Sequence, residues 1–189
     1  MNLKRKRIVL LGATGSIGKN VINLVDRYPK LFKIVAVSAN KNFKLLSDII
    51  RKYKPLKACL SGVDYNNEIA NIEKSCKVLF GKEKLLELVK VKADLIIIGI
   101  SGFSGINSIF EALKTGTNIA IANKESIICG WNLINKELKK NKTKFVPVDS
   151  EHFSIWCLTN EKYENIDEIY LTASGGPFLN KKRGPSYHS

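Results

Sequence analysis

Two carboxylates lie two residues apart in the segment 147–152 (PVDSEH), and they could hold a metal ion. Asp149 and Glu151 flank the hydroxyl of Ser150, and an imidazole follows at His152. Hard cations such as Mg²⁺ and Mn²⁺ prefer oxygen ligands, and Mg²⁺ is often held by one or two carboxylates with water and substrate. The same pattern is typical of a helix start, in which Asp149 or Ser150 is the N-cap and Glu151 lies in the first turn. The residues alone leave both interpretations open.

A glycine-rich turn over residues 12–18 (GATGSIG) is the second stretch whose residues could form a functional site. It follows a short apolar run at residues 7–11 and precedes a helical pattern over residues 19–28. In this context glycines let the backbone approach a pyrophosphate, and the helix N-terminus offers free N–H groups. The spacing is G-x-x-G-x-x-G and not G-x-G-x-x-G, so a turn that only packs a helix on a strand is the alternative.

The end of the next apolar run, residues 33–38, favours NADPH over NADH. NAD sites usually carry an acidic residue about 20 residues after the glycines, which bonds to the ribose 2′-hydroxyl. Here the run is followed by Asn40, Lys41 and Asn42, with a cation and without an acid. A 2′-phosphate would meet no like charge there, so the sequence predicts a preference for NADP. The alternative is an ordinary basic loop.

Apolar runs alternate with helical patterns along most of the chain. The runs cover residues 7–11, 33–38, 57–60, 77–80, 94–98, 118–122 and 144–148, and helical patterns lie between them, among them 43–53, 66–76 and 82–91. This alternation predicts an α/β protein with a Rossmann-like, doubly wound, mostly parallel sheet. Ligands bind outside the carboxyl ends of the strands in such sheets. Because the stretches 12–18, 99–105, 123–126 and 149–152 all follow predicted strands, we expect them to meet at one edge.

A second unit is expected to begin at residue 149. Residues 1–148 would form the NADPH-binding domain, and residues 149–189 would begin an α+β catalytic domain that the chain does not complete. We expect a helix over residues 153–158 and a strand over residues 168–173. Ser174 and the two glycines after it could cradle a phosphate or form a plain turn.

Composition and charge exclude several classes of protein. There are 31 lysines and arginines against 17 acids, a net charge of +14. This charge could attract phosphorylated substrates, dinucleotides or nucleic acid, but the favoured interpretation is that many of the lysines are surface residues without a binding role. The lysines are spread along the chain and are not interleaved with aromatic residues, which argues against a nucleic-acid binder. No apolar run reaches the about 18 residues of a membrane span, and no signal peptide is present. We expect a cytoplasmic protein without a membrane partner.

Cysteines and tryptophans are expected to be structural. Cys59, Cys76, Cys129 and Cys157 lie in or beside apolar runs and form no Cys-x-x-Cys pair, which is typical of buried free thiols in a reducing compartment. The two tryptophans, at positions 131 and 156, are expected in the core. Lys124 could pair with a substrate oxygen or be solvated.

Four motifs together resemble one enzyme family. They are GATGSIG (12–18), ANKES (122–126), PVDSEH (147–152) and LTASGGPF (171–178). In this order and at these separations the motifs resemble 1-deoxy-D-xylulose 5-phosphate reductoisomerases, the NADPH- and metal-dependent enzymes of the non-mevalonate isoprenoid pathway. The resemblance covers nearly all of residues 7–179. It implies an oxidoreductase that isomerises and reduces 1-deoxy-D-xylulose 5-phosphate, a small phosphorylated sugar, to 2-C-methyl-D-erythritol 4-phosphate. It also implies a homodimer.

The resemblance implies a role for each matching residue. The NADPH contacts it implies are Thr14, Gly15, Ser16, Ile17, Asn40, Lys41, Asn42, Asn123 and Glu125. The Mn²⁺ or Mg²⁺ ligands it implies are Asp149 and Glu151. The substrate contacts it implies are Lys124, Ser150, Glu151 and Ser174, and the catalytic residues are Lys124, Asp149 and Glu151.

Some features depart from the family. Asn40 stands where the family usually has glycine, and Ser154, Trp156 and Cys157 stand where it usually has alanine, phenylalanine and glutamine. The family continues for about as many residues again, so we expect a truncated chain that binds NADPH weakly or moderately and turns over little. A non-catalytic NADP-binding remnant is one alternative. Another NADP-linked reductase, such as a semialdehyde dehydrogenase with a cysteine nucleophile, is a second.

Overall fold

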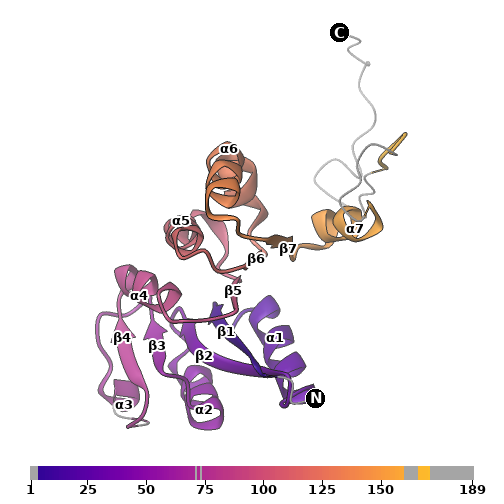
Figure 1. Cartoon of the computed structure of the whole chain (residues 1–189). Coiled ribbons are helices and arrows are strands. Elements are labelled where there is room, and N and C mark those ends of the chain that lie inside the picture. Colours follow the sequence, from indigo (N-terminus) through magenta and orange to yellow (C-terminus); the bar gives the residue numbers. More distant parts are fainter. Residues whose placement is uncertain (1–3, 71, 73, 160–165, 171–189) are drawn as a thin grey trace, which may run out of the picture.

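The structure is a computed structural model that describes residues 4–70, 72, 74–159 and 166–170. Within these residues seven parallel strands form one sheet, in the order β4-β3-β2-β1-β5-β6-β7 (Figure 1). The strands are β1 (Lys6–Leu11), β2 (Phe32–Ala39), β3 (Lys57–Leu60), β4 (Lys77–Phe80), β5 (Leu95–Ile98), β6 (Ile119–Ile121) and β7 (Phe145–Pro147). The predicted Rossmann-like parallel sheet is therefore confirmed.

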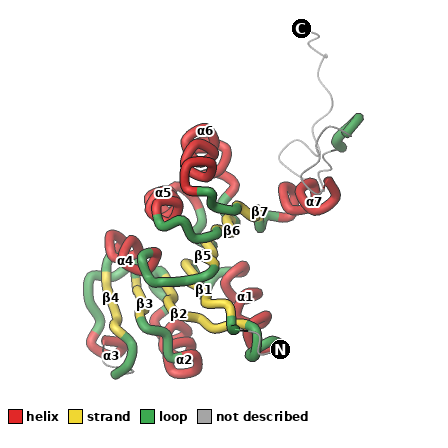
Figure 2. Tube along the Cα trace, viewed as in Figure 1, coloured by secondary structure: helices red, strands yellow, loops and turns green. Residues whose placement is uncertain are grey.

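Helices follow the strands in alternation, as Figure 2 shows along the trace. The α-helices are α1 (Ser16–Arg27), α2 (Phe43–Tyr53), α3 (Asn67–Ala70), α4 (Leu85–Val89), α5 (Ile106–Lys114), α6 (Lys124–Asn141) and α7 (Ser150–Thr159). Two short 3₁₀ helices, η1 (Lys82–Lys84) and η2 (Gly102–Gly105), precede α4 and α5. A parallel pairing needs such crossover connections, because each strand must return to the same end of the sheet.

Two apolar clusters cover the two faces of the sheet. On one face Val9 and Leu11 of β1 pack with buried side chains of α4, α5 and α6. On the other face Ile8 and Leu10 pack with side chains of α1 and α2. Alternate residues of one strand thus enter opposite layers, which explains why the strands are continuous apolar runs. Figure 1 shows α7 beyond the β7 end of the sheet, away from both layers.

The centre of the sheet is a topological switch point. From β1 the chain builds outward through β2 and β3 to β4, and it then crosses back to place β5 on the other side of β1. In open α/β sheets the crevice for a ligand lies outside the carboxyl ends of the two strands at this point. Here those strands are β1 and β5, and they are followed by the glycine turns at 12–18 and 99–105.

The opposite end of the same two strands is clamped by an ion pair. The Arg7 guanidinium donates to Asp94 at 2.9 and 3.1 Å, and the Arg7 backbone N–H donates to Oδ2 at 2.8 Å. These donors, the side chain first and the backbone second, hold the pKa of Asp94 well below its ordinary value of 3.8. The clamp fixes the register of β1 against β5 at the end away from the crevice.

Some predicted elements differ from the structure. The helix expected over residues 66–76 is only α3, which buries one side chain, Ile69, before the chain extends to pair β4 with β3. The helix expected over residues 82–91 is divided into η1 and α4. Residues 168–170 form no strand, and residues 171–173 lie outside the described residues.

Two tryptophans and two cysteines predicted to be buried are not. Trp131 is 41% exposed and Trp156 is partly exposed, while Cys129 and Cys157 are exposed. Trp131 and Cys129 lie on α6, which buries only the stripe that faces the sheet, and Trp156 and Cys157 lie on α7, which has no buried residue. Among helices in the described residues, none is long and apolar enough to cross a membrane.

Candidate functional site

A hollow of about 350 Å³ opens at the carboxyl ends of β1, β2, β3, β4 and β5. Its lining residues are Gly12, Thr14, Gly15, Ser38, Ala39, Asn40, Ser61, Lys82, Leu85, Gly99, Ile100 and Ser101. Three of the predicted NADPH residues, Thr14, Gly15 and Asn40, are among them. The hollow is thus at the switch point, where the fold places a dinucleotide crevice.

The glycine turn is shaped by close backbone contacts. Gly12 has a φ of +84°, and a Cβ there would lie 2.7 Å from the carbonyl oxygen of Gly99. A Cβ on Gly18 would lie 2.3 Å from the carbonyl oxygen of Gly12. Any side chain at either position would therefore separate α1 or β5 from the turn. This requirement explains the glycines without reference to a ligand, and it also keeps the backbone bare where a pyrophosphate would lie.

The start of α1 is open toward an anion. Gly15 is its N-cap, with extended backbone, and among the described residues no side chain caps the first turn. The free N–H groups and the positive end of the helix dipole are therefore available to a negatively charged group. Ser16 and Ile17 lie in this first turn, and Ile17 packs beside Gly99.

Ser38 is a site residue that the sequence reasoning missed. Its hydroxyl accepts the Gly12 N–H at 3.0 Å, and its carbonyl accepts the Ala13 N–H at 2.8 Å. The end of β2 therefore holds the glycine turn in place. A small polar residue at the end of a buried strand was the only signal in the sequence.

The loop from β2 to α2 contains Asn40, Lys41 and Asn42. Asn40 lines the hollow, and its carbonyl accepts the Gly62 N–H at 2.9 Å. Lys41 is exposed. Asn42 caps α2, because its Oδ1 accepts the Leu45 N–H at 3.1 Å. The loop thus combines a cation with the N-terminus of an eleven-residue helix, both suited to a phosphate.

Asn123 has a structural role that could not be predicted from the motif. The side chain is 3% exposed, and its Oδ1 caps α6 by accepting the Ser126 N–H at 2.9 Å. Its amide nitrogen donates to the carbonyls of Ile100, at 2.9 Å, and Gly102. Asn123 therefore ties the second glycine turn to α6 with its side chain. Glu125, in the first turn of α6, is exposed.

Asp149 caps α7 with one carboxylate oxygen, and its other oxygen has no hydrogen-bond partner in the part of the chain that the structure describes. Its Oδ1 accepts the His152 N–H at 3.0 Å and lies 2.6 Å from the His152 Nδ1, so this oxygen caps α7. Its Oδ2 is buried and has no hydrogen-bond partner among the described residues. A buried carboxylate oxygen without a partner is costly, and a cation would satisfy it.

Glu151 lies one residue beyond Ser150 on the same turn, and it is half exposed, at 53%. Its Oε2 accepts the Ser150 hydroxyl at 3.0 Å, and its Oε1 lies 3.5 Å from the Lys124 ammonium. Its pKa is lowered by its own backbone N–H, by Ser150 and by the Lys124 charge, in that order. The carboxylate is therefore ionised at neutral pH, as a metal ligand must be.

The candidate cation ligands in this part of the chain are two carboxylates, those of Asp149 and Glu151. Within the described residues no group of three or more histidine, cysteine, aspartate or glutamate side chains could hold a metal ion. The unpartnered Oδ2 of Asp149 and the ionised Glu151 fit Mg²⁺ or Mn²⁺, which take oxygen ligands and keep several waters. Ser174, predicted to bind substrate, lies outside the described residues.

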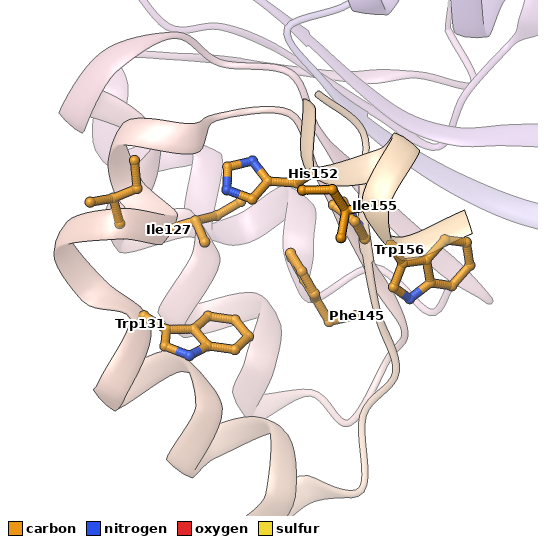
Figure 3. Close-up of a pocket in the computed structure, with 8 residues that line it drawn as sticks. Ile127, Trp131, Phe145, His152, Ile155 and Trp156 are labelled. Carbon is orange, nitrogen blue, oxygen red and sulfur yellow. The ribbon is translucent and has the colours of Figure 1, made fainter. Parts of the chain in front are cut away.

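Two further hollows flank α7. One of about 580 Å³ is bordered by Ser150, Glu151 and Ser154 and by Ile166 and residues 168–170. The other, of about 480 Å³, is apolar, and in it side chains of α6 face those of β7 and α7 (Figure 3). Its lining residues are Ile127, Ile128, Trp131, Phe145, Pro147, His152, Ile155 and Trp156. Glu151 thus borders the first of these hollows, and His152 borders the second.

Comparison with known proteins agrees with this geometry. A sequence model of 1-deoxy-D-xylulose 5-phosphate reductoisomerase matches residues 8–130, and one of the C-terminal domain of that enzyme matches residues 145–186. The chain belongs to the 1-deoxy-D-xylulose 5-phosphate reductoisomerase family. The reductoisomerase of Pelagibacter ubique is 44% identical over 182 residues, which are 93% of this chain and 46% of that protein. The reductoisomerase of Caldanaerobacter subterraneus is 36% identical over 94% of this chain and 47% of that protein.

Solved structures give the same family. A reductoisomerase in complex with magnesium has a TM-score of 0.83 at 28% identity, over 95% of this chain and 48% of that one. The Zymomonas mobilis reductoisomerase in complex with NADPH has a TM-score of 0.75 at 29% identity, over 79% of this chain and 40% of that one. Staphylococcus aureus homoserine dehydrogenase, at 15% identity and a TM-score of 0.51, shares the fold alone. The chain spans about half the length of the reductoisomerases it matches.

Three residues that depart from the usual reductoisomerase pattern, Ser154, Trp156 and Cys157, lie on α7, and Cys157 is exposed. The Ser154 hydroxyl donates to the Ser150 carbonyl at 2.6 Å, which adds a bond inside the first turns of the helix. Trp156 lines the apolar hollow. None of the three replaces a carboxylate or a hydroxyl of the motif.

Proposed function

We propose that this chain carries the NADPH site and the first two metal ligands of a 1-deoxy-D-xylulose 5-phosphate reductoisomerase. The reaction is the NADPH- and metal-dependent isomerisation and reduction of 1-deoxy-D-xylulose 5-phosphate to 2-C-methyl-D-erythritol 4-phosphate. One observation carries the proposal: the glycine turn after β1, the Asn123–Glu125 segment after β6 and the two carboxylates after β7 share the carboxyl edge of one sheet. The NADPH and magnesium complexes of related enzymes support it.

The cofactor half of the site would work through backbone groups and one charged loop. Thr14 and Gly15, with Ser16 and Ile17 behind them, would hold the pyrophosphate at the open start of α1. The residues Asn40, Lys41 and Asn42 would hold the 2′-phosphate. Asn123 would position the 99–105 turn against the nicotinamide end, next to Glu125. NADPH, when bound, supplies the hydride.

The metal half would work through ionised oxygens. Asp149 Oδ2 and the Glu151 carboxylate would hold Mg²⁺ or Mn²⁺, and His152 would fix Asp149 by occupying its other oxygen. The metal, when bound, polarises the carbonyl and hydroxyl oxygens of the substrate as a Lewis acid. Lys124 would exchange its contact with Glu151 for a substrate oxygen, and the Ser150 hydroxyl would bind substrate beside it.

The finer assignments follow from the same proposal. Residues 1–148 would form the cofactor domain and residues 149–189 the beginning of the catalytic domain, which the match of residues 145–186 to the family's C-terminal domain supports. Ser174 would bind the phosphorylated substrate, since a related enzyme binds the phosphonate fosmidomycin. We further infer a homodimer and a cytoplasmic location, the second supported by the four free thiols.

A chimera tests the proposed reaction. Residues 1–178 of this chain would replace the matching part of the Pelagibacter ubique reductoisomerase, and NADPH oxidation would be followed at 340 nm. We expect oxidation that requires both the sugar phosphate and Mg²⁺, and a loss of at least about 100-fold in Asp149→Asn and Glu151→Gln. Ser154→Ala, beside the pair, is the matched control and should keep the rate. A folded chimera that binds NADPH and stays inactive, or one unaffected by Asp149→Asn, would contradict the proposal.

A further inference from the structure

We infer that Lys82 is a second cation of the cofactor site and that it contributes, with Lys41, to the choice of NADP over NAD. The inference rests on the proposed function and adds a specificity-determining residue to it. Lys82 is the first residue of η1, separated from β4 by Gly81 alone, and it lines the same hollow as Thr14, Gly15 and Asn40. None of the four sequence motifs contains Lys82.

Backbone hydrogen bonds join the carboxyl ends of three neighbouring strands, β2, β3 and β4, beside Lys82. The Ser61 N–H donates to the Ala39 carbonyl and the Gly62 N–H to the Asn40 carbonyl, both at 2.9 Å, which joins the end of β3 to that of β2. The Gly81 N–H donates to the Leu60 carbonyl at 3.2 Å, which joins the end of β4 to that of β3. Lys82 is therefore held on the same wall of the hollow as the loop after β2.

The order of the strands decides which part of the cofactor Lys82 would meet. Neighbouring strands lie about 4.8 Å apart, so β4 is about 10 Å from β2 and about 14 Å from β1. A pyrophosphate lies over the turn after β1, whereas the adenosine ribose lies at the end of β2. A long lysine side chain that projects into the hollow from β4 is thus directed toward the 2′-phosphate end.

Lys82 is also free to make this contact. It is exposed, and in the part of the chain that the structure describes no carboxylate pairs with it. Lys84, two residues on in the same η1 helix, instead pairs with Glu87 at 2.7 Å and does not line the hollow. A lysine ammonium is a point charge that attracts the anionic 2′-phosphate of NADPH. The ribose 2′-hydroxyl of NADH is neutral and does not gain this attraction. Lys82 would therefore distinguish NADPH from NADH.

The test uses the 189-residue chain, titrated with NADPH and with NADH by reduced-nicotinamide fluorescence. In Lys82→Gln we expect NADPH to bind about two- to fivefold more weakly, as for a solvent-exposed charge contact, while the dissociation constant of NADH stays unchanged. The loss should shrink at high salt. Lys84→Gln is the matched control and should behave as the unmodified chain. Far-UV circular dichroism and the melting temperature establish that each variant is folded.

The outcomes separate this inference from the proposed function. If the unmodified chain prefers NADPH and Lys82→Gln keeps the same ratio of the two dissociation constants, Lys82 does not read the 2′-phosphate and the inference is wrong. An equal loss for both cofactors also overturns it, because Lys82 would then touch a part that they share. If the unmodified chain shows no preference, the proposed cofactor is wrong as well.

Discussion

At the scale of single residues, Asp149 shows how one side chain can serve a fold and a site together. One carboxylate oxygen caps α7 through the His152 N–H, and the other is buried without a partner among the described residues. The first oxygen agrees with the helix-cap interpretation of the sequence, and the second is left available for the metal-ligand interpretation. The helix cap alone leaves that second oxygen unexplained, and this is why the cation is part of the proposal.

Gly18 gives a residue-scale prediction. In Gly18→Ala the new Cβ would lie 2.3 Å from the Gly12 carbonyl oxygen, and the neighbours are backbone atoms that cannot turn away. We expect the free energy of unfolding to fall by about 1–3 kcal/mol, and NADPH binding to weaken because the turn must move. Urea unfolding measures the first and fluorescence titration the second.

Gly130 supplies the control, because it is also a buried helical glycine. A Cβ at this position would lie 3.3 Å from the Cδ1 atom at the end of the flexible Ile134 side chain. Gly130→Ala should stay within about 1 kcal/mol of the unmodified chain, on either side, since alanine also favours the helix. Equal losses in the two variants would show that the contact at Gly18 is not the reason for that glycine.

At the scale of elements, the loops of the site are held by side-chain bonds between neighbouring strand ends. Ser38 at the end of β2 holds the first glycine turn, and Asn123 at the end of β6 holds the second. The crevice is therefore shaped before any ligand arrives, which lowers the entropy cost of binding. The family resemblance implies that Asn123 contacts the cofactor, but its side-chain amide already makes hydrogen bonds to backbone groups of the protein.

Asn123 and Asn42 make a matched pair at this scale, since each caps a helix. Asn123→Ala removes the cap of α6 and both donors to the 99–105 turn, so we expect a loss of about 2–4 kcal/mol in the free energy of unfolding. Asn42→Ala removes only the exposed cap of α2 and should cost about 1 kcal/mol. Chemical unfolding followed by circular dichroism compares them, and similar losses would mean that Asn123 is only a cap.

At the scale of the whole molecule, the sequence predicted the strands well because the central ones, β1, β2, β5 and β6, are apolar runs with β-branched residues that are mostly buried. All seven predicted strands of the sheet are present, and the marked stretches lie at their carboxyl ends. The sequence did not predict which side chains α6 and α7 expose, because burial of Trp131 and Trp156 depends on what packs beside β7. Nor did it single out Ser38 or Lys82, since each is one ordinary residue whose meaning comes from strands that lie far apart in the chain.

The clamp between β1 and β5 gives a pH prediction for the whole fold. The pKa of Asp94 is lower in the folded chain than in the unfolded one, so its contribution to stability is complete above about pH 5 and is lost as the pH falls toward about 2. Thermal unfolding at several pH values should therefore show that the melting temperature falls less on acidification in Asp94→Asn than in the unmodified chain. Asp48→Asn, which breaks an exposed pair with Arg51 at 3.6 Å, should follow the unmodified chain.

The central claim is that the carboxyl edge of this sheet binds NADPH, and one titration tests it most directly. The purified chain would be titrated with NADPH and with NADH, following the fluorescence of the reduced nicotinamide. We predict saturable binding of both and tighter binding of NADPH, because Lys41 would meet the 2′-phosphate in a loop without an acid. Saturable binding with equal or tighter affinity for NADH, or no binding to a chain shown to be folded, would contradict it.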